Sequence, residues 1–369
     1  MKKDKLNIFI SPLDWGLGHI TRTIPVINLF REHGHNVVLG GGRNAMTIYK
    51  NEFPGLEFEP LPSCAISYPS KGSLVWSLIK QLPSFFAVIR KEKRKVAKII
   101  SKYKIDVIIS DNRYGLYNPD VYCVFITHQL MLKLPSSVQF MEKWVYRRHQ
   151  RMISRFNSCW VPDFPRPPYL AGDLAHLYPP SRNTVFIGPL SRFNTDFCED
   201  VKKEYLNDVI AIISGPEPSR TSFEEKIISQ LSLINKKCLI VRGLPNETDS
   251  IKALPDNINV VNHLSACDLK ESILNSHYII ARAGYSTIMD LVALCRTAVL
   301  VPTPGQTEQE YLASYYNARK LFLCISERDM NIEEALNQIT LYNWNLNTRT
   351  CSIMSAEVQK IEKLLSERN

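Results

Sequence analysis

The chain has 369 residues, of which 45% are hydrophobic and 22% charged. This length and composition predict a buried core and two folded domains, and they exclude extensive disorder. The net charge of +9 favours anionic partners such as phosphate groups or a membrane surface. Nucleic acid is not expected, because the sequence has no zinc-finger spacing, RNP-type aromatic motif or basic leucine zipper.

The first half of the chain contains several short apolar runs of strand length. The first of them, Leu6 to Ile10, is followed by Ser11-Pro12. Between several of these runs lie segments with helical periodicity, such as Thr23–His33. The further predicted strands are Asn36–Leu39, Asp106–Ile109, Val121–Ile126 and Ser158–Val161.

The second half repeats this alternation of strands and helices. Continuous apolar runs are typical of parallel strands buried on both faces, so each half predicts a doubly wound, Rossmann-like α/β domain. The predicted strands are Val209–Ile213, Cys238–Val241, Asn259–Val261, Tyr278–Ala281 and Ala298–Val301. The predicted helices are Glu224–Leu233, Asp268–Asn275 and Ser286–Leu294.

A turn-rich segment, Gly188 to Arg192, is followed by a polar stretch to about Asn207 and predicts the hinge between the domains. We therefore expect a first domain over residues 1–190, a second over 191–350, and a C-terminal helix within 351–369. The helical pattern of that tail covers Ser355–Leu365.

The nine cysteines are scattered and odd in number. This distribution favours reduced thiols and argues against a disulfide framework or a cysteine-based zinc site. The first five residues lead into a short strand-like run rather than a long apolar segment, so no signal peptide is expected. Both observations favour a cytoplasmic protein.

A glycine-bearing loop, Asp14 to His19, follows the first predicted strand. We expect a helix to start near Thr21 to Thr23, with Pro25 in its first turn. Gly16 and Gly18 allow a sharp turn and close approach of a ligand, and the helix N-terminus favours negative charge. The third glycine of the dinucleotide fingerprint is missing, which disfavours dinucleotide chemistry.

His19 is expected at the carboxyl edge of the first sheet, where open α/β sheets bind ligands. A neutral imidazole there can take a proton from an attacking hydroxyl. The alternative is a loop histidine that only bonds the backbone. Asp14, Asp111 and His128 lie on the same predicted edge, either as partners of His19 or the acceptor, or as structural residues.

Three polar loops follow strands at one edge of the second domain. The first runs from Ser214 to Arg220, the second from Arg282 to Thr287, and the third from Pro302 to Glu310. Turn and capping chemistry explains each loop alone. Three such loops on one edge favour a ligand site.

The second loop offers backbone amides and hydroxyls for a diphosphate at Gly284, Ser286 and Thr287. Ser286 is equally suited to a plain N-cap. Asp290, one turn further on, can accept both ribose hydroxyls. The third loop supplies groups for sugar hydroxyls from Gln306, Glu308 and Gln309.

These residues together resemble the MurG-like, family 28 type of GT-B glycosyltransferases. The specific part is Arg282 to Asp290, followed by Val301–Gln306 and Glu308-Gln309; Gly16–His19 and Gly188–Leu190 match less specifically. The resemblance covers almost the whole chain. It implies two Rossmann-like domains facing each other across a cleft, with a nucleotide sugar, commonly UDP-linked, in the second and an acceptor in the first. It implies no metal or other cofactor.

The resemblance also implies roles for single residues. It places the ribose carboxylate on Asp290, where Glu is usual, the proposed base on His19, and backbone contacts to the nucleobase around Asn262–Leu264. The expected donor-binding residues are Ser214, Gly215, Arg220, His263, Leu264, Arg282, Gly284, Tyr285, Ser286, Thr287, Asp290, Gly305, Gln306, Glu308 and Gln309. The expected acceptor-binding residues are Asp14, Gly16, Gly18, Asp111 and His128.

The expected function is transfer of a hexose or N-acetylhexosamine from the donor to a hydroxyl of a glycan or lipid-linked glycan. The loop Gly16–His19 differs from the Gly-Thr-Gly-Gly-His of peptidoglycan enzymes, so their lipid intermediate is not the expected acceptor. The pattern Gly-x-Gly-His-x-x-Arg also resembles nucleotide-sugar hydrolases on this fold, which activate water. A hydrolase is therefore the first alternative, and a non-catalytic nucleotide-sugar-binding protein is the second.

An apolar segment from Leu74 to Ile89 is interrupted by Lys80 and Pro83, too often for a transmembrane span. One interpretation is contact with an anionic membrane, at the inner face of the plasma membrane, which suits a polyprenyl-linked acceptor. The other is a core helix followed by a solvated basic face. The basic residues that follow are Arg90, Lys91, Lys93, Arg94, Lys95 and Lys98.

Overall fold

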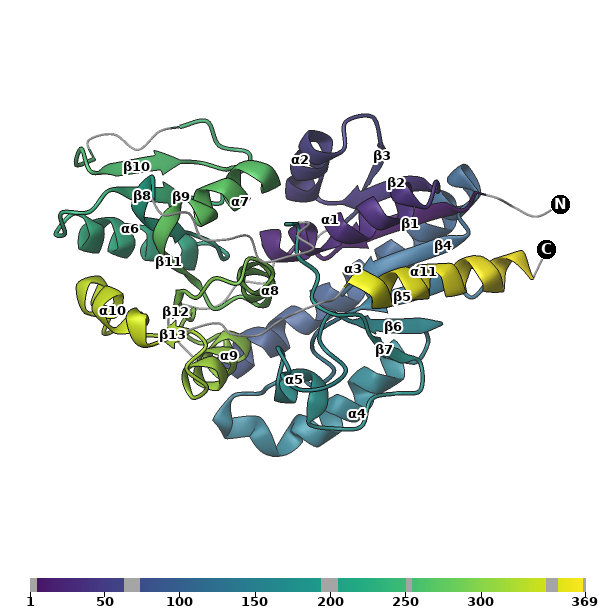
Figure 1. Cartoon of the computed structure of the whole chain (residues 1–369). Helices are drawn as coiled ribbons and strands as arrows, with labels where there is room; N and C mark the ends of the chain where they lie inside the picture. The colour runs from purple at the N-terminus through teal and green to yellow at the C-terminus, as the bar shows by residue number, and fades with distance from the viewer. Residues whose placement is uncertain (1–4, 63–73, 194–204, 250–253, 343–350, 368–369) are drawn as a thin grey trace.

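The computed structural model describes residues 5–62, 74–193, 205–249, 254–342 and 351–367. Two separate parallel sheets, each flanked by helices, form the chain (Figure 1). The fold class predicted from the sequence, two doubly wound α/β domains, is confirmed. The limits at residues 190 and 350 remain predictions.

The first sheet has seven parallel strands in the order β3-β2-β1-β4-β5-β6-β7. Its strands are β1 Asn7–Pro12, β2 Asn36–Gly41, β3 Glu57–Pro60, β4 Val107–Asp111, β5 Tyr122–Ile126, β6 Ser158–Val161 and β7 Thr184–Phe186. Its helices are α1 Leu17–Glu32, α2 Arg43–Glu52, α3 Leu74–Tyr103, α4 Glu142–Ile153 and α5 Asp173–His176, with a 3-10 helix at Ser136–Met141.

The second sheet has six parallel strands in the order β10-β9-β8-β11-β12-β13. Its strands are β8 Asn207–Ile212, β9 Cys238–Val241, β10 Ile258–Val261, β11 Ser276–Arg282, β12 Val299–Val301 and β13 Leu323–Cys324. The helices are α6 Ser219–Leu231, α7 Ala266–Leu274, α8 Tyr285–Ala293, α9 Thr307–Asn317, α10 Ile332–Gln338 and α11 Cys351–Ser366, with a 3-10 helix at Ile339–Leu341.

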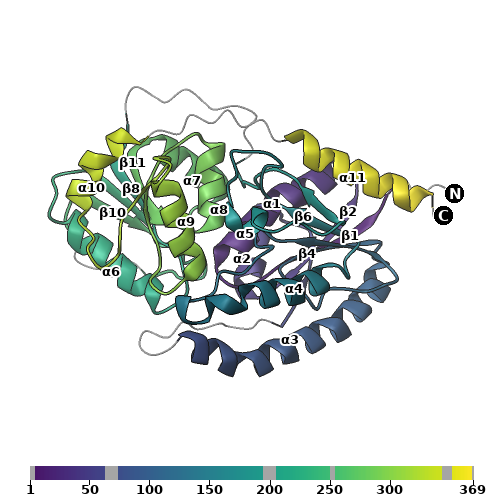
Figure 2. The ribbon, with the colours of Figure 1, turned by 90° about the horizontal axis from the view of Figure 1, so that it is seen from below.

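The strand order reverses between β1 and β4 in the first sheet and between β8 and β11 in the second. Ligands of open α/β sheets bind at such switch points, beyond the carboxyl ends of the strands. Helices α1 and α8 start beyond those ends and pack against each other between the sheets (Figure 2). The two switch points therefore face each other.

The start of α1 differs from the prediction. The helix begins at Leu17, not near Thr21, so Pro25 lies inside it rather than in its first turn. The helix accommodates Pro25 but lacks one backbone hydrogen bond there, because proline has no N–H group. Because the helix begins earlier, His19 belongs to its first turn and not to a preceding loop.

The C-terminal helix returns to the first domain, as Figures 1 and 2 show. Val358 and Ile361 of α11 are buried in the core cluster that contains the first sheet. His33 and His35, at the turn between α1 and β2, contact Glu362 at 2.8 and 2.9 Å. The helix therefore ties the end of the chain to the first domain.

Two further findings bear on the sequence analysis. Cys295 is disulfide-bonded, so the expectation of reduced thiols is wrong for this residue. The free cysteines of the described part are Cys123, Cys159, Cys238, Cys267 and Cys324. Within the described ranges, no helix has the length and apolar character needed to cross a membrane.

Candidate functional site

The N-termini of α1 and α8 meet at the centre of the molecule. The Ser286 hydroxyl donates a 2.8 Å hydrogen bond to the Gly18 carbonyl. A Cβ added to Gly18 would lie 2.9 Å from that hydroxyl oxygen, so the close approach requires a glycine there. The predicted acceptor loop and the predicted diphosphate loop are thus brought together.

Both helix starts are suited to an anion. Each has a glycine N-cap, Gly16 and Gly284, without a side-chain cap, and neither has an acidic residue in its first turn. The first-turn amides of a helix carry partial positive charge and have no intrahelical acceptor. Two such helix starts in contact suit the charge of a diphosphate.

His19 and Asp111 form a hydrogen-bonded pair next to these helix starts. His19 Nδ1 lies 2.9 Å from Asp111 Oδ1, and Asp111 is fully buried at the end of β4. The carboxylate accepts a hydrogen bond from the Nδ1–H group, so the lone pair of the neutral imidazole lies on Nε2. Burial, and then the positive charge of Arg22, lowers the pKa of His19, so the imidazole is neutral at neutral pH.

Arg22 holds Asp111 ionised from the other side. Its Nε lies 2.5 Å from Asp111 Oδ2, and its Nη2 contacts the other carboxylate oxygen. Burial alone would raise the pKa of Asp111, but the charges of Arg22 and His19 outweigh burial and hold that pKa at about 2. The pair therefore has the hydrogen-bond pattern of a base and its orienting carboxylate.

His128 and Glu308, predicted for opposite substrates, contact each other across the cleft. His128 Nε2 lies 2.7 Å from Glu308 Oε1, and the Gln129 amide donates to the other oxygen of Glu308. Tyr285 stacks on His128 with ring centroids 4.1 Å apart and bonds the Pro162 carbonyl at 2.7 Å. In this structure Tyr285 and Glu308 therefore join the domains.

Helix α9 strengthens this contact between the domains. The Tyr311 hydroxyl accepts a 2.6 Å hydrogen bond from the Asp173 amide. The hydroxyls of Tyr315 and Tyr316 donate 2.7 Å bonds to the Tyr169 and Leu170 carbonyls. The third polar loop, which precedes α9, is thus positioned by the first domain.

Within that third loop, two predicted residues bond each other. Gln309 Nε2 lies 2.5 Å from Gln306 Oε1, while Gln309 Oε1 accepts a 2.9 Å bond from the Thr303 amide. Gly305 has a φ of +80°, which a glycine adopts without strain. The loop is thus prearranged by its own side chains.

Asp290 is buried and bonded to the segment between the domains. The Ser191 hydroxyl donates to it at 2.8 Å and Arg192 Nε at 3.0 Å. Burial raises the pKa of Asp290 against the opposing charge of Arg192. His263, half-buried at the end of β10 before Leu264, lies within the electrostatic reach of Arg192, and burial lowers its pKa. Asp290 and His263 are therefore close to one guanidinium group.

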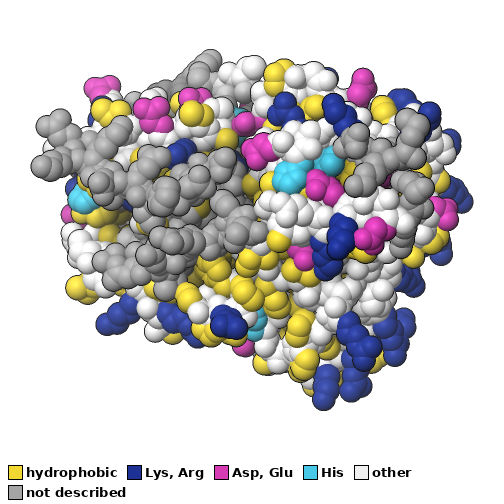
Figure 3. All heavy atoms as spheres, turned by 45° about the vertical axis from the view of Figure 1, so that its right-hand side comes forward, with side chains coloured by type: hydrophobic (Ala, Val, Ile, Leu, Met, Phe, Trp, Pro, Cys, Tyr) yellow, Lys and Arg dark blue, Asp and Glu magenta, His cyan; other side chains and the backbone are white. Residues whose placement is uncertain are grey.

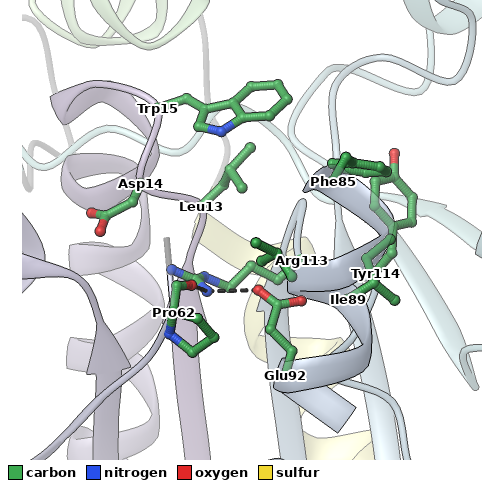
Figure 4. A pocket seen from close by; sticks show the side chains of 10 residues that line it. Leu13, Asp14, Trp15, Pro62, Phe85, Ile89, Glu92, Arg113 and Tyr114 are labelled. Carbon is green, nitrogen blue, oxygen red and sulfur yellow. Dashed lines mark hydrogen bonds and ion pairs between the residues drawn. The ribbon is translucent and has the colours of Figure 1, made fainter. Parts of the chain in front are cut away.

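A pocket in the first domain lies between the loop after β1, helix α3 and the segment after β4 (Figure 4). Trp15, Phe85 and Tyr114 contribute apolar walls, and Arg113 pairs with Glu92 at 2.7 Å in the figure. Asp14 also lines it. Asp14 Oδ1 and Arg113 Nη2 are buried and have no hydrogen-bond partner among the described residues.

Comparisons with known proteins bear on the family and the fold. Residues 222–365 match the glycosyltransferase family 28 C-terminal domain. A UDP-N-acetylglucosamine–N-acetylmuramyl-(pentapeptide) pyrophosphoryl-undecaprenol N-acetylglucosamine transferase of Sulfurihydrogenibium is 22% identical, with 98% of each chain covered. The protein is a glycosyltransferase whose second half carries the family 28 C-terminal domain and which is similar to MurG-like enzymes.

Other similar proteins extend over most of the chain. A glycosyltransferase of Methanosarcina acetivorans is 22% identical over 83% of this chain and 81% of its own. Acinetobacter baumannii MurG matches with a TM-score of 0.52 and 15% identity, covering 97% and 99% of the two chains. The kitacinnamycin glycosyltransferase matches with a TM-score of 0.60 and 14% identity, covering 98% and 95%. The fold is therefore GT-B.

Two arginines predicted for the donor site form ion pairs with carboxylates of the second domain. Arg282 is buried, contacts Glu327 at 2.6 Å and lies over the Phe223 ring. Arg220 is buried between Glu217 and Glu224, at 2.5 and 3.0 Å. Both guanidinium groups therefore have carboxylate partners within the second domain, and their contact with a donor remains a prediction.

The space next to Gly215 is open to a ligand. It follows Ser214 at the end of β8, with a φ of +122°, and a Cβ added there would meet no atom within 4 Å. Thr287, in the first turn of α8, is half-buried. Both residues remain predicted donor contacts.

Four charged residues of the site were not predicted: Arg22, Arg113 and Glu92, which are buried, and Arg192, which is partly buried. Their only signal in the sequence is Arg22 in the Gly-x-Gly-His-x-x-Arg pattern. Arg192 belongs to the predicted hinge, where a turn-rich sequence does not indicate a partner such as Asp290.

One cluster among the described residues has the spacing of metal ligands: His33, His35 and Glu362. The Leu6 amide donates to His35 Nδ1 at 3.3 Å, so neutral His35 carries its proton on Nε2, which faces Glu362 at 2.9 Å. A metal on Nε2 would require the opposite tautomer. In the glycosyltransferase these residues are a contact between α11 and the first domain.

Proposed function

We propose that this glycosyltransferase moves a sugar from a UDP-linked donor, bound mainly by the second domain, to an acceptor hydroxyl bound by the first. The observation that carries the proposal is the His19–Asp111 pair, with its 2.9 Å contact, beside the two helix starts. This arrangement combines a candidate base with a candidate diphosphate site.

In the proposed reaction, His19 Nε2 takes the proton of the acceptor hydroxyl while the acceptor oxygen bonds to the anomeric carbon. The bond from the anomeric carbon to the phosphate oxygen breaks, and the nucleoside diphosphate leaves with the electron pair. The first-turn amides of α1 and α8 stabilise the negative charge that develops on it, so the step requires no metal.

In this proposal, residues of the second domain that lie near the start of α8 hold the donor. Gly284, Ser286 and Thr287 lie at the start of α8, beside the proposed diphosphate position. Asp290 accepts a hydrogen bond from the Ser191 hydroxyl, and a ribose hydroxyl could donate in its place. His263 and Leu264 are the proposed neighbours of the nucleobase.

The first prediction is that UDP raises the melting temperature, because a ligand that binds only the folded state stabilises it, by about 2.7 kcal/mol at one hundred times its dissociation constant. We expect Asp290→Ala to remove most of this shift and Asp329→Ala, at an exposed position, to keep it. The measurement is thermal denaturation with a panel of nucleotides, in EDTA. If another nucleotide diphosphate alone stabilises the protein, the donor is not UDP-linked; if none does, the donor site is wrongly placed.

The proposed acceptor is a glycan carried by a membrane lipid, and one surface of the first domain supports this. Phe86, Phe140 and Trp144 are exposed on α3, the 3-10 helix and α4. Phe85 packs on Tyr114, which bonds His149, so α3 and α4 are neighbours. Figure 3 shows Lys and Arg side chains gathered on the lower part of this domain. Exposed basic residues of the two helices include Arg90, Lys91, Lys93, Arg94, Lys143, Arg147, Arg148 and Arg151.

The second prediction is that the protein binds vesicles containing phosphatidylglycerol and not vesicles of phosphatidylcholine alone. Each basic residue near an anionic surface contributes about 1 kcal/mol, so Arg147→Gln with Arg148→Gln should weaken binding about 30-fold. The matched control is Lys320→Gln with Arg328→Gln, which removes two exposed charges from the second domain. The measurement is vesicle co-sedimentation at several salt concentrations, and equal loss in both double variants would contradict the proposed surface.

A further inference from the structure

A chain of polar contacts, buried at Asp111, Arg22 and His128, runs from His19 to the second domain. From Asp111 it passes to Arg22, whose Nη1 lies 3.0 Å from His128 Nδ1, and from His128 to Glu308 at 2.7 Å. Arg22 and His128 are 2% and 3% exposed, so water does not compensate the loss of these contacts. The chain therefore links the candidate base to a carboxylate on the opposite side of the cleft.

The tautomer of His128 follows from its neighbours. Arg22 can only donate, so His128 Nδ1 must carry the lone pair at their 3.0 Å contact. A neutral His128 then carries its proton on Nε2 and donates it to Glu308. Each contact in the chain has one donor and one acceptor: Asp111 accepts from His19 and Arg22, Arg22 also donates to His128, and His128 donates to Glu308.

The chain is complete only when the two domains are together. Arg22, Asp111 and His128 belong to the first domain, whereas Glu308 lies in the first turn of α9 in the second. Tyr285, also from the second domain, covers one face of His128 with an interplanar angle of 5°. Separation of the domains would therefore remove Glu308 and uncover His128.

We propose that Arg22, His128 and Glu308 form a relay between the domains that makes His19 a stronger base when the domains are closed. Arg22 and His128 are positioning residues, and Glu308 supplies the negative charge. This inference rests on the proposed role of His19 and assigns Glu308 a role other than direct contact with the donor sugar.

The physical reason lies in the charges that face His19. These groups are Arg22 on its own helix, Asp111 from β4, His128 after β5 and Glu308 from α9. Arg22 and, more weakly, His128 oppose protonation of His19, while Asp111 favours it. Glu308 interacts favourably with charged His19, so its arrival on closure stabilises the imidazolium that forms as the acceptor proton is taken.

The test is the pH dependence of kcat in Glu308→Gln, which keeps the size of the side chain. We expect the acidic limb to move to lower pH by roughly half a unit to one unit, and the plateau of kcat to fall about threefold to tenfold. Glu333→Gln, which removes an exposed charge on α10, should leave the profile unchanged. A higher KM for the donor with an unmoved acidic limb would show direct sugar binding and overturn the relay.

A double-mutant cycle tests the path through His128. If Glu308 acts through His128, His128→Gln combined with Glu308→Gln should lower kcat no further than the stronger single variant. Multiplicative losses would overturn the relay. Normal turnover in a His19 variant would instead refute the proposed function, so the two failures are distinguishable.

Discussion

Replacement of His19 by alanine should lower kcat by a factor of about 10² to 10⁴, the usual contribution of a positioned general base. The reason is the 2.9 Å contact with Asp111, which leaves Nε2 of His19 with the lone pair at the helix starts. UDP should still raise the melting temperature of this variant, because His19 is not a predicted donor contact. The measurement is sugar transfer at saturating donor, together with the thermal shift.

The pH profile gives a second criterion for His19. Burial lowers the pKa of His19 below its ordinary value of 6.5, so the native enzyme should lose activity only below neutral pH, as His19 becomes protonated. The His19→Ala variant should lack this acidic limb. The control is His277→Ala, at the exposed amino end of β11, and an equal loss in both variants would contradict a catalytic His19.

Replacement of Asp111 by asparagine should impair both stability and catalysis. Asp111 is fully buried and pairs with Arg22, and removal of one partner from such a pair costs about 3 to 5 kcal/mol. His19 loses its orienting carboxylate at the same time, so kcat should fall by at least two orders of magnitude, as expected for a mispositioned base. Urea denaturation measures the first effect, and turnover well below the melting temperature measures the second.

Acid denaturation should separate native Asp111 from this variant. The pKa of Asp111 is about 2 in the folded protein and has a reference value of 3.8. Its stabilising contribution is therefore present above pH 4 and is lost as the pH falls towards 2. The Asp111→Asn variant should lack this component, while Asp120→Asn, at an exposed position, should retain it. A variant as stable as the native protein would contradict the buried ion pair.

Much of the fold could be predicted from local sequence. Buried parallel strands such as Ser158–Val161 and Cys238–Val241 are continuous apolar runs, and both were predicted with the boundaries that the structure has. Short or polar elements were missed, including α2, β3 and β7. Their composition resembles that of loops, because half-exposed elements at the edge of a sheet need little apolar sequence.

Residue types at strand ends also identified the loops of the site. His19, Gly18 and Ser286 follow predicted strands, and the geometry of parallel sheets places the carboxyl ends of those strands at one edge. The contact of Gly18 with Ser286 could not be predicted, because it depends on how the two domains pack.

The sequence by itself determined the two α/β domains, the glycine-bearing segments after the strands and His19 as the candidate base, because each depends on local periodicity or on one strand end. Only the tertiary structure decided the state of that base. Arg22 and Asp111 are 89 residues apart, and His128 and Glu308 are 180 residues apart. A buried charge can be balanced by any opposite charge that the fold brings within a few ångströms, and no local pattern specifies which one.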